Sequence, residues 1–330
     1  MKRDRKSGGN LFLTAFTMSA GGLLCFLYGM YRMNAGLKQA AGPVLQHKIQ
    51  KILQKPWQGI LAGASVTALI QSSSAVTVML VGMADAGMIS LAGSIGIILG
   101  ADLGTTCTAW LLHWTALRPA SSFSWSMMQP QILLLASLLL GFLLPKCSWK
   151  YGRACGNIFL GFGILWCGMQ SMNSGIQPLI QQPVLFQQVS ESHQFFTYIL
   201  AGTVFTALVQ SSSAAVGVLQ VFSMSGLMDW KMCIPLLLGV NLGTCATAVL
   251  AGLRVRREAG QVAVLHILIK VRGILWGTVL FYIWMYFSGP SLENSVYSMQ
   301  IAGIYTMFNL LNLLLLYPWQ KQLVYLAQRF

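Results

Sequence analysis

Two matching runs of one amide and three hydroxyl side chains stand far apart in the chain. Residues 67–76 read TALIQSSSAV and residues 206–215 read TALVQSSSAA. A serine hydroxyl donates one hydrogen bond and accepts two, so such a run can bind an anion or a small hard cation. Hydroxyls and amides alone can hold a phosphate group, with sodium ions supplying the compensating charge.

The two runs belong to a longer internal repeat. A shift of 139 residues places GMYRMNAGL (29–37) on GMQSMNSGI (168–176), and GADLGTTCTA (100–109) on GVNLGTCATA (239–248), without a gap. Between 67–109 and 206–248, 18 of 43 positions are identical. Two related membrane units at a fixed spacing are typical of transporters built from structural repeats.

The composition indicates that the elements carrying these runs lie in a lipid bilayer. Hydrophobic residues make up 55% of the 330 residues and charged residues 8%, whereas a soluble domain has about a quarter charged. The apolar runs do not alternate, which excludes a membrane β-barrel. We therefore predict an all-α polytopic membrane protein. The clearest apolar runs are Leu11–Met30, Ile132–Leu144, Ile158–Met169, Ile234–Leu253, Val262–Phe287 and Ile301–Tyr317.

The positions of the basic residues predict inverted topology for the two repeats. The net charge of +14 comes from short Lys and Arg clusters between apolar runs, which argues against nucleic acid as a partner. Residues 32–55 carry five Lys or Arg, whereas the counterpart 173–194 carries none. Equivalent segments with opposite charge should lie on opposite sides of the membrane. We expect a first repeat at 1–145 (core 22–112) and a second at 146–330 (core 161–253), with closing helices at 261–287 and 299–317.

Each serine run is predicted to lie at the tip of a re-entrant helical hairpin. On a continuous helix, four consecutive polar residues would point in four directions, some of them toward lipid. The apolar runs on either side, Ile60–Ile70 and Ala75–Met83, are too short to span the bilayer. We expect hairpins at about 58–86 and 197–226. A half-helix N-terminus suits an anion, and unwound carbonyls with hydroxyl oxygens suit sodium.

The paired QSSS runs, together with the segments GADLGT (100–105) and GVNLGT (239–244), resemble the sodium-dependent phosphate cotransporter (type II Na/Pi) family. The resemblance covers roughly residues 22–317. It implies that phosphate and sodium bind between the two hairpins. The implied phosphate-binding residues are Gln71, Ser72, Ser73, Ser74, Gln210, Ser211, Ser212 and Ser213. The implied candidates for sodium binding are Thr67, Asp102, Thr105, Thr106, Thr206, Asn241 and Thr244.

Four residues depart from the pattern of that family. Asp102 stands where the pattern, and the second repeat at Asn241, has Asn. A carboxylate at membrane depth costs about 2.5–3.5 kcal/mol on insertion scales, so Asp102 is predicted to bind a cation or a proton. The alternative is a protonated Asp that mimics Asn. AVLHILIK (263–270) and AGIYTMFN (302–309) resemble an Ala-x-x-His-x-x-Phe-Asn pattern of the family. Ile269 and Lys270 replace Phe and Asn in the first copy, and Tyr305 replaces His in the second. Helix packing is the alternative role of both copies.

These features predict a secondary active transporter that couples phosphate movement to sodium by alternating access, in a bacterial plasma membrane. One alternative is another oxyanion, or proton coupling, or phosphate export. Less favoured are an intramembrane hydrolase using Ser72 or Ser211 and a membrane scaffold that transports nothing. No cofactor is expected beyond the coupling sodium ion. Family members often carry a PhoU-like domain; here we expect any such regulator to be a separate protein.

Overall fold

A computed structural model describes residues 2–52, 56–116, 130–180, 195–253, 255–288 and 294–330, and this part of the chain is nearly all helical. Its helices in chain order are α1 (Lys2–Ile52), α2 (Pro56–Ile70), α3 (Ser73–Asp85), α4 (Leu91–Ala116), α5 (Pro130–Leu143), η2 (Leu144–Lys146), α6 (Gly152–Ile180), α8 (Phe195–Val209), α9 (Ser212–Met224), α10 (Trp230–Gly243), α11 (Cys245–Gly252), α12 (Arg257–Ser288), α13 (Ser298–Leu316), η4 (Tyr317–Trp319) and α14 (Gln320–Gln328).

Five helical stretches of the described chain are long and apolar enough to cross a membrane, which makes this a multi-pass membrane protein. They are Leu13–Ala40, Leu91–Trp114, Trp230–Gly252, Arg257–Phe287 and Ser298–Gln328. The runs predicted at 132–144 and 158–169 fall in α5 and α6 and are not among these five. Of the segment 173–194, which has no Lys or Arg, residues 181–194 lie outside the described residues.

The chain forms two compact units, and each draws residues from both halves of the sequence. Unit 1 consists of Met1–Ala40, Leu112–His193 and Val218–Met228. Unit 2 consists of Ala41–Leu111, Gln194–Gly217 and Asp229–Phe330. Both QSSS runs and all seven predicted sodium-binding candidates lie in unit 2.

In unit 1, α1 and α6 pack antiparallel through glycines spaced seven residues apart. A Cβ atom added at Gly22 would collide with the backbone at Met172, and one added at Gly29 would collide with the backbone at Leu165. As residue numbers rise along α1, the facing residue numbers on α6 fall, so the two helices run in opposite directions. Small residues let helix backbones approach closely in lipid, where van der Waals packing drives association.

The same contact is made in reverse from the α6 side. A Cβ atom at Gly161 would collide with the backbone at Met33, and one at Gly168 with the backbone at Phe26. Gly161 and Gly168 are the residues 139 positions after Gly22 and Gly29. Because each contact recurs with the repeats exchanged, a local two-fold axis relates α1 to α6.

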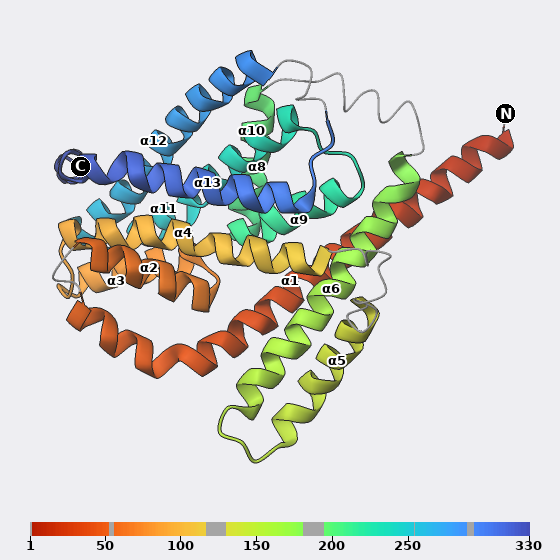
Figure 1. The fold of residues 1–330 in the computed structure, drawn as a ribbon, viewed down its shortest axis with the longest axis horizontal. Coiled ribbons are helices and arrows are strands. Elements are labelled where there is room, and N and C mark those ends of the chain that lie inside the picture. Colours follow the sequence, from red (N-terminus) through yellow and green to blue (C-terminus); the bar gives the residue numbers. More distant parts are fainter. Residues whose placement is uncertain (1, 53–55, 117–129, 181–194, 254, 289–293) are drawn as a thin grey trace. The chain divides into compact units, whose positions relative to one another are not determined.

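In unit 2, α2 packs parallel to α4 through glycines. A Cβ atom added at Gly100 would collide with the carbonyl group of Ile60, and one added at Gly104 would lie 2.7 Å from Cβ of Thr67. Residue numbers rise together along the two helices, so they run in the same direction. Figure 1 shows α2, α3 and α4 as orange to yellow neighbours.

The second repeat builds the same interface between α8 and α10. A Cβ atom added at Gly239 would collide with the carbonyl group of Ile199, and one added at Gly243 would lie 2.6 Å from Cβ of Thr206. All four residues are those of the first pair shifted by 139. The sequence repeat is therefore also a repeat of local packing.

An apolar core in unit 2 joins α12 to these elements. It includes Val76 and Leu80 of α3, Ile98 of α4, and Leu265 and Ile269 of α12, each 2% exposed or less. The core holds α12 against α3 and α4, so the polar residues next to Leu265 and Ile269 are also buried.

Candidate functional site

Both QSSS runs begin at the same backbone turn. Gln71 and Gln210 each have φ of 55°, and they are the two non-glycine residues with positive φ among those described. This left-handed conformation is uncommon for a residue with a Cβ atom. It ends α2 and α8, and α3 and α9 start within two residues of it. The turn therefore places each serine run at a helix N-terminus.

The first serine of each run caps the helix that follows. Ser72 Oγ accepts a hydrogen bond of 3.2 Å from the backbone N–H of Ala75. Ser211 Oγ accepts one of the same length from Ala214. An N-cap satisfies one of the four N–H groups that a helix N-terminus leaves without a partner in the helix. The others can donate to an anion together with the neighbouring serine hydroxyls.

The remaining serines of both runs are buried. Ser73 and Ser74 are 3% and 7% exposed, and Ser212 and Ser213 are 4% and 3% exposed. The two glutamines differ, because Gln71 is 7% exposed whereas Gln210 is exposed. The two turns are therefore alike in backbone and capping but not in their access to solvent or lipid.

Several buried polar atoms near these turns have no hydrogen-bond partner among the described residues. They include the hydroxyl oxygens of the repeat-equivalent Thr67 and Thr206, both 0% exposed. Oε1 of Gln71 and Oδ2 of Asp102 are also buried and also lack a hydrogen-bond partner among the described residues. Buried polar atoms nearly always have a partner, so these oxygens are available to accept a hydrogen bond or to coordinate a cation.

The predicted threonine oxygens of α4 and α10 use their protons within their own helices. The hydroxyl groups of Thr105, Thr106 and Thr244 donate to backbone carbonyls three residues earlier, at 2.6, 2.7 and 2.7 Å. Since its own proton is engaged, Thr105 accepts the contact of 3.3 Å from the hydroxyl of Tyr305. These hydroxyls are thus oriented as acceptors, which suits a cation better than an anion.

A buried ion pair lies between the two repeats in unit 2. Lys270 Nζ is 2.6 Å from Oδ1 of Asp102 and donates a second hydrogen bond of 3.2 Å to Oδ1 of Asn241. The side chains of Lys270 and Asp102 are each 3% exposed. Asp102 and Asn241 are repeat-equivalent residues, so one ammonium group binds the same position of both repeats.

The helix that leads into the first serine run packs against α4, the helix that carries Asp102. The N–H of Gln71 donates to the carbonyl of Thr67 at 2.6 Å. The Thr67 side chain packs against Gly104, two residues after Asp102 on α4. The first QSSS turn therefore lies close to Asp102.

The second repeat makes the same connection. The N–H of Gln210 donates to the carbonyl of Thr206 at 2.7 Å, and the Thr206 side chain packs against Gly243, two residues after Asn241. Since Asp102 and Asn241 share Lys270, this lysine joins α4 and α10, the two helices against which α2 and α8 pack before the QSSS turns. Among the described residues, no hydrogen bond joins the two serine runs directly.

Sequence reasoning marked Lys270 as a departure from the family pattern but gave it no role. A signal for its pairing with Asp102 is present in the sequence. Asp102 and Lys270 are opposite charges in apolar segments, where an isolated charge is costly, so an ion pair between them could have been expected. His266, one turn earlier on α12, was also left without a role. Its Nδ1 is 3.4 Å from the hydroxyl of Thr77 on α3, and its Nε2 has no partner among the described residues.

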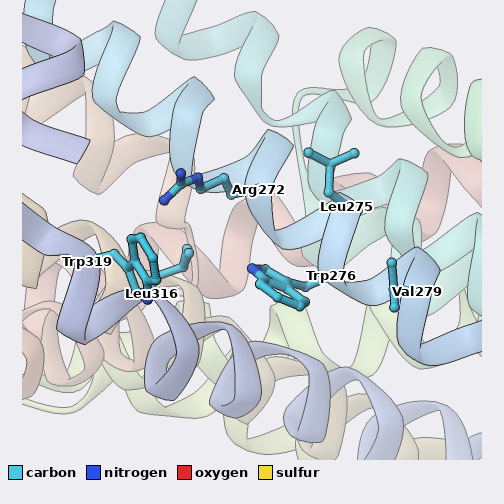
Figure 2. A pocket seen from close by; sticks show the side chains of 6 residues that line it. All are labelled: Arg272, Leu275, Trp276, Val279, Leu316 and Trp319. Atoms are coloured by element: carbon cyan, nitrogen blue, oxygen red, sulfur yellow. The ribbon is translucent and has the colours of Figure 1, made fainter. Parts of the chain in front are cut away.

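A separate pocket of about 300 Å³ lies between α12 and the end of α13. Figure 2 shows Arg272, Leu275, Trp276 and Val279 of α12 around it, with Leu316 and Trp319 opposite. Arg272 lies over the ring of Trp319 at 5.6 Å. Because this lining is mostly apolar and contains no predicted site residue, we do not place the phosphate site here.

Comparison with known proteins agrees with the motifs. The chain is 29% identical to "Uncharacterized protein YqeW" of Bacillus subtilis over 268 residues, 80% of this chain and 81% of YqeW. It is 26% identical to "Putative inorganic phosphate export protein YjbB" of Escherichia coli over 261 residues, 78% of this chain but 45% of YjbB. No solved structure matches the chain.

A shorter match reaches a mammalian transporter. Over 90 residues, 27% of this chain and 14% of the relative, it is 33% identical to "Sodium-dependent phosphate transport protein 2A" of Rattus norvegicus. The sequence profile described as Na+/Pi-cotransporter matches residues 25–174 and 180–308, which is most of the chain. With both serine runs inside those matched ranges, the chain belongs to the Na+/Pi-cotransporter family.

Proposed function

We propose that this protein is a secondary active transporter that moves inorganic phosphate across a bacterial cell membrane, with sodium as the coupling ion. The observation that carries the proposal is that the helices leading into the two QSSS turns pack against α4 and α10, and that Lys270 joins α4 to α10 through Asp102 and Asn241. This packing concentrates helix N-termini, buried hydroxyls and unpaired oxygens in one region of unit 2. Membership of the family supports phosphate as the substrate.

The packing supports a hairpin at each serine run. α2 has 15 residues, so it is about 22 Å long, shorter than a hydrocarbon core of about 30 Å. Because α4 runs parallel to α2 and begins beside it, the intervening α3 has to run back from the turn at Gln71. The same argument applies to α8, α9 and α10. Two re-entrant hairpins with serine tips agree with these constraints.

The antiparallel packing of α1 and α6 supports inverted topology. These helices occupy equivalent positions in the two repeats and are related by a local two-fold axis. Equivalent helices that run in opposite directions are expected when one repeat is inverted in the membrane. Inverted repeats around a central site are the architecture on which alternating access depends.

The ion pair makes the site compatible with an anionic substrate. An unpaired Asp102 carboxylate would repel phosphate. Lys270 neutralises that charge at 2.6 Å, while the N-terminus of α3 and the buried serine hydroxyls supply donors. We therefore assign phosphate to the helix N-termini of the QSSS runs, and sodium to the acceptor oxygens of Thr67, Thr206 and the threonines of α4 and α10.

Export of phosphate is a second candidate for the direction of transport. A relative that matches 78% of this chain carries export of inorganic phosphate in its name. Direction follows from the gradients and the stoichiometry, so the same site can serve export. A hydrolase is less favoured, since the hydroxyls of Ser72 and Ser211 act as helix caps and the buried His266 contacts Thr77.

The test is labelled phosphate flux in proteoliposomes under a sodium, potassium or proton gradient. We expect flux that sodium accelerates and that unlabelled phosphate inhibits more strongly than sulfate. Ser137→Ala is a matched control, because the Ser137 hydroxyl only donates to its own helix in α5. Protein-dependent flux that responds to protons alone would select the proton-coupled alternative. No flux under any gradient would contradict transport.

A further inference from the structure

The Lys270 ammonium group lies where the two repeats present the same residue position. Its contacts at 2.6 and 3.2 Å are to side-chain oxygens of Asp102 and Asn241, which are 139 residues apart in the repeat. Oxygen atoms are also the ligands that a small hard cation prefers. The ammonium group therefore lies at a position that offers cation ligands from both repeats.

The chain itself contains a version of this motif without the lysine. AVLHILIK and AGIYTMFN align Lys270 with Asn309. Asn309 is 1% exposed, donates to the carbonyl of Tyr305 at 2.9 Å, and leaves its Oδ1 without a partner among the described residues. Where one copy has a neutral amide with a free oxygen, the other has a fixed positive charge.

The negative charge of Asp102 and the positive charge of Lys270 cancel, and each stands where the other copy of its motif has a neutral amide. Asp102 is a carboxylate where its repeat equivalent, Asn241, is an amide, and Lys270 is a cation where its motif equivalent, Asn309, is an amide. The pair adds no net charge to the buried region. Removing only the ammonium group would leave the side-chain oxygens of Asp102 and Asn241 without the cation that they share, and Oδ2 of Asp102 already has no partner among the described residues.

We propose that Lys270 is a built-in cation that fills a monovalent-cation site formed by Asp102 and Asn241, so that the transporter binds no mobile cation at this position. Sodium then acts only at other oxygens of the protein, or fewer sodium ions move with each phosphate. The consequence for transport rests on the proposed function. The existence of the site does not, and it can be tested by binding alone.

The test compares thermal unfolding of the purified full chain in sodium chloride and in choline chloride at equal ionic strength. Lys270→Asn removes the ammonium group, places the side chain of the second motif copy there, and leaves the Asp102 carboxyl group in place. We expect sodium to raise its unfolding temperature by several degrees more than that of the wild type. Lys270→Asn combined with Asp102→Asn removes the carboxylate and should abolish this extra response.

Lys270→Ala is a second variant in case Asn does not pack. Equal sodium responses in the wild type and in a folded Lys270 variant would overturn the proposal, as would a response that survives loss of Asp102. Failure of both Lys270 variants to fold even in sodium would also contradict it, because sodium is expected to replace the ammonium group.

Phosphate flux then tests the consequence for coupling. In proteoliposomes we expect the flux of Lys270→Asn to depend more steeply on sodium concentration than that of the wild type. An unchanged dependence would contradict the effect on coupling. Absence of any phosphate flux in the wild type would instead refute the proposed function, while the unfolding comparison would still decide whether the cation site exists.

Discussion

Lys270 of α12 and Asp102 of α4 form a buried ion pair of 2.6 Å, although they are 168 residues apart in the sequence. Each charge would be costly to bury alone, and together they are neutral. The pair also fixes the point where α12 meets both α4 and α10, because Lys270 donates to Asn241 as well. Structure and charge balance in unit 2 thus depend on the same three side chains.

The first prediction concerns stability. Asp102→Ala leaves a buried, unpaired Lys270 and should lower the free energy of unfolding by about 3–5 kcal/mol. Combining it with Lys270→Met removes both charges and should recover most of that loss. Chemical or thermal unfolding in detergent measures all three proteins. A double variant less stable than Asp102→Ala would show that the pair is not the source of the effect.

The second prediction concerns phosphate binding. Ser73→Ala and its repeat equivalent Ser212→Ala each remove a buried hydroxyl near a helix N-terminus. A hydrogen bond to a charged group is worth about 1.5–3 kcal/mol, so the phosphate concentration for half-maximal flux should rise by about 10- to 100-fold. Flux measured against phosphate concentration checks this. Ser137→Ala should behave as the wild type, and an unchanged half-maximal concentration in both site variants would remove these serines from the site.

The third prediction separates the backbone role of Gln71 from that of its side chain. Gln71→Gly suits the φ of 55° and should keep the fold, but without the amide it should weaken phosphate flux. Gln71→Val places a β-branched residue in the left-handed region and should cost about 1–2 kcal/mol of stability. Unfolding and flux are measured on both variants. Gln71→Gly with normal flux would mean that only the turn is needed.

The fourth prediction concerns packing in unit 1. Gly29→Ala adds a Cβ atom against the backbone of α6 and should destabilise the protein by about 1–3 kcal/mol. Gly21→Ala is the matched control, because nothing lies within 4 Å of an added Cβ atom at that position of the same helix. Unfolding temperatures of the two variants test it. Equal stability would contradict the close approach of α1 and α6.

Much of the site could be predicted from the sequence because it is built from short motifs of consecutive residues. The QSSS runs are short, and a shift of 139 residues finds the glycines that recur in the packing of α2 with α4 and of α8 with α10. Length and hydropathy similarly indicate which helices cross a membrane. The apolar run at 132–144 is a less reliable indicator of a membrane span, because α5 has 14 residues and is short for crossing a bilayer.

The contacts between helices could not be predicted in this way. Asp102 was recognised as unusual from its own position, but its partner follows from the packing of α12 against α3 and α4. The difference between a buried Gln71 and an exposed Gln210 is likewise invisible in two identical QSSS runs. Burial depends on what each turn packs against, and the neighbours of the two turns differ.

The sequence by itself determined that this is a helical membrane protein with two related repeats, each with a hydroxyl-rich run, because composition and periodicity are properties of the chain alone. Only the tertiary structure decided that one lysine, Lys270, contacts the same position of both repeats. That choice depends on which side chains helices far apart in the sequence bring within hydrogen-bond distance, in a medium where an unpaired charge is too costly to keep.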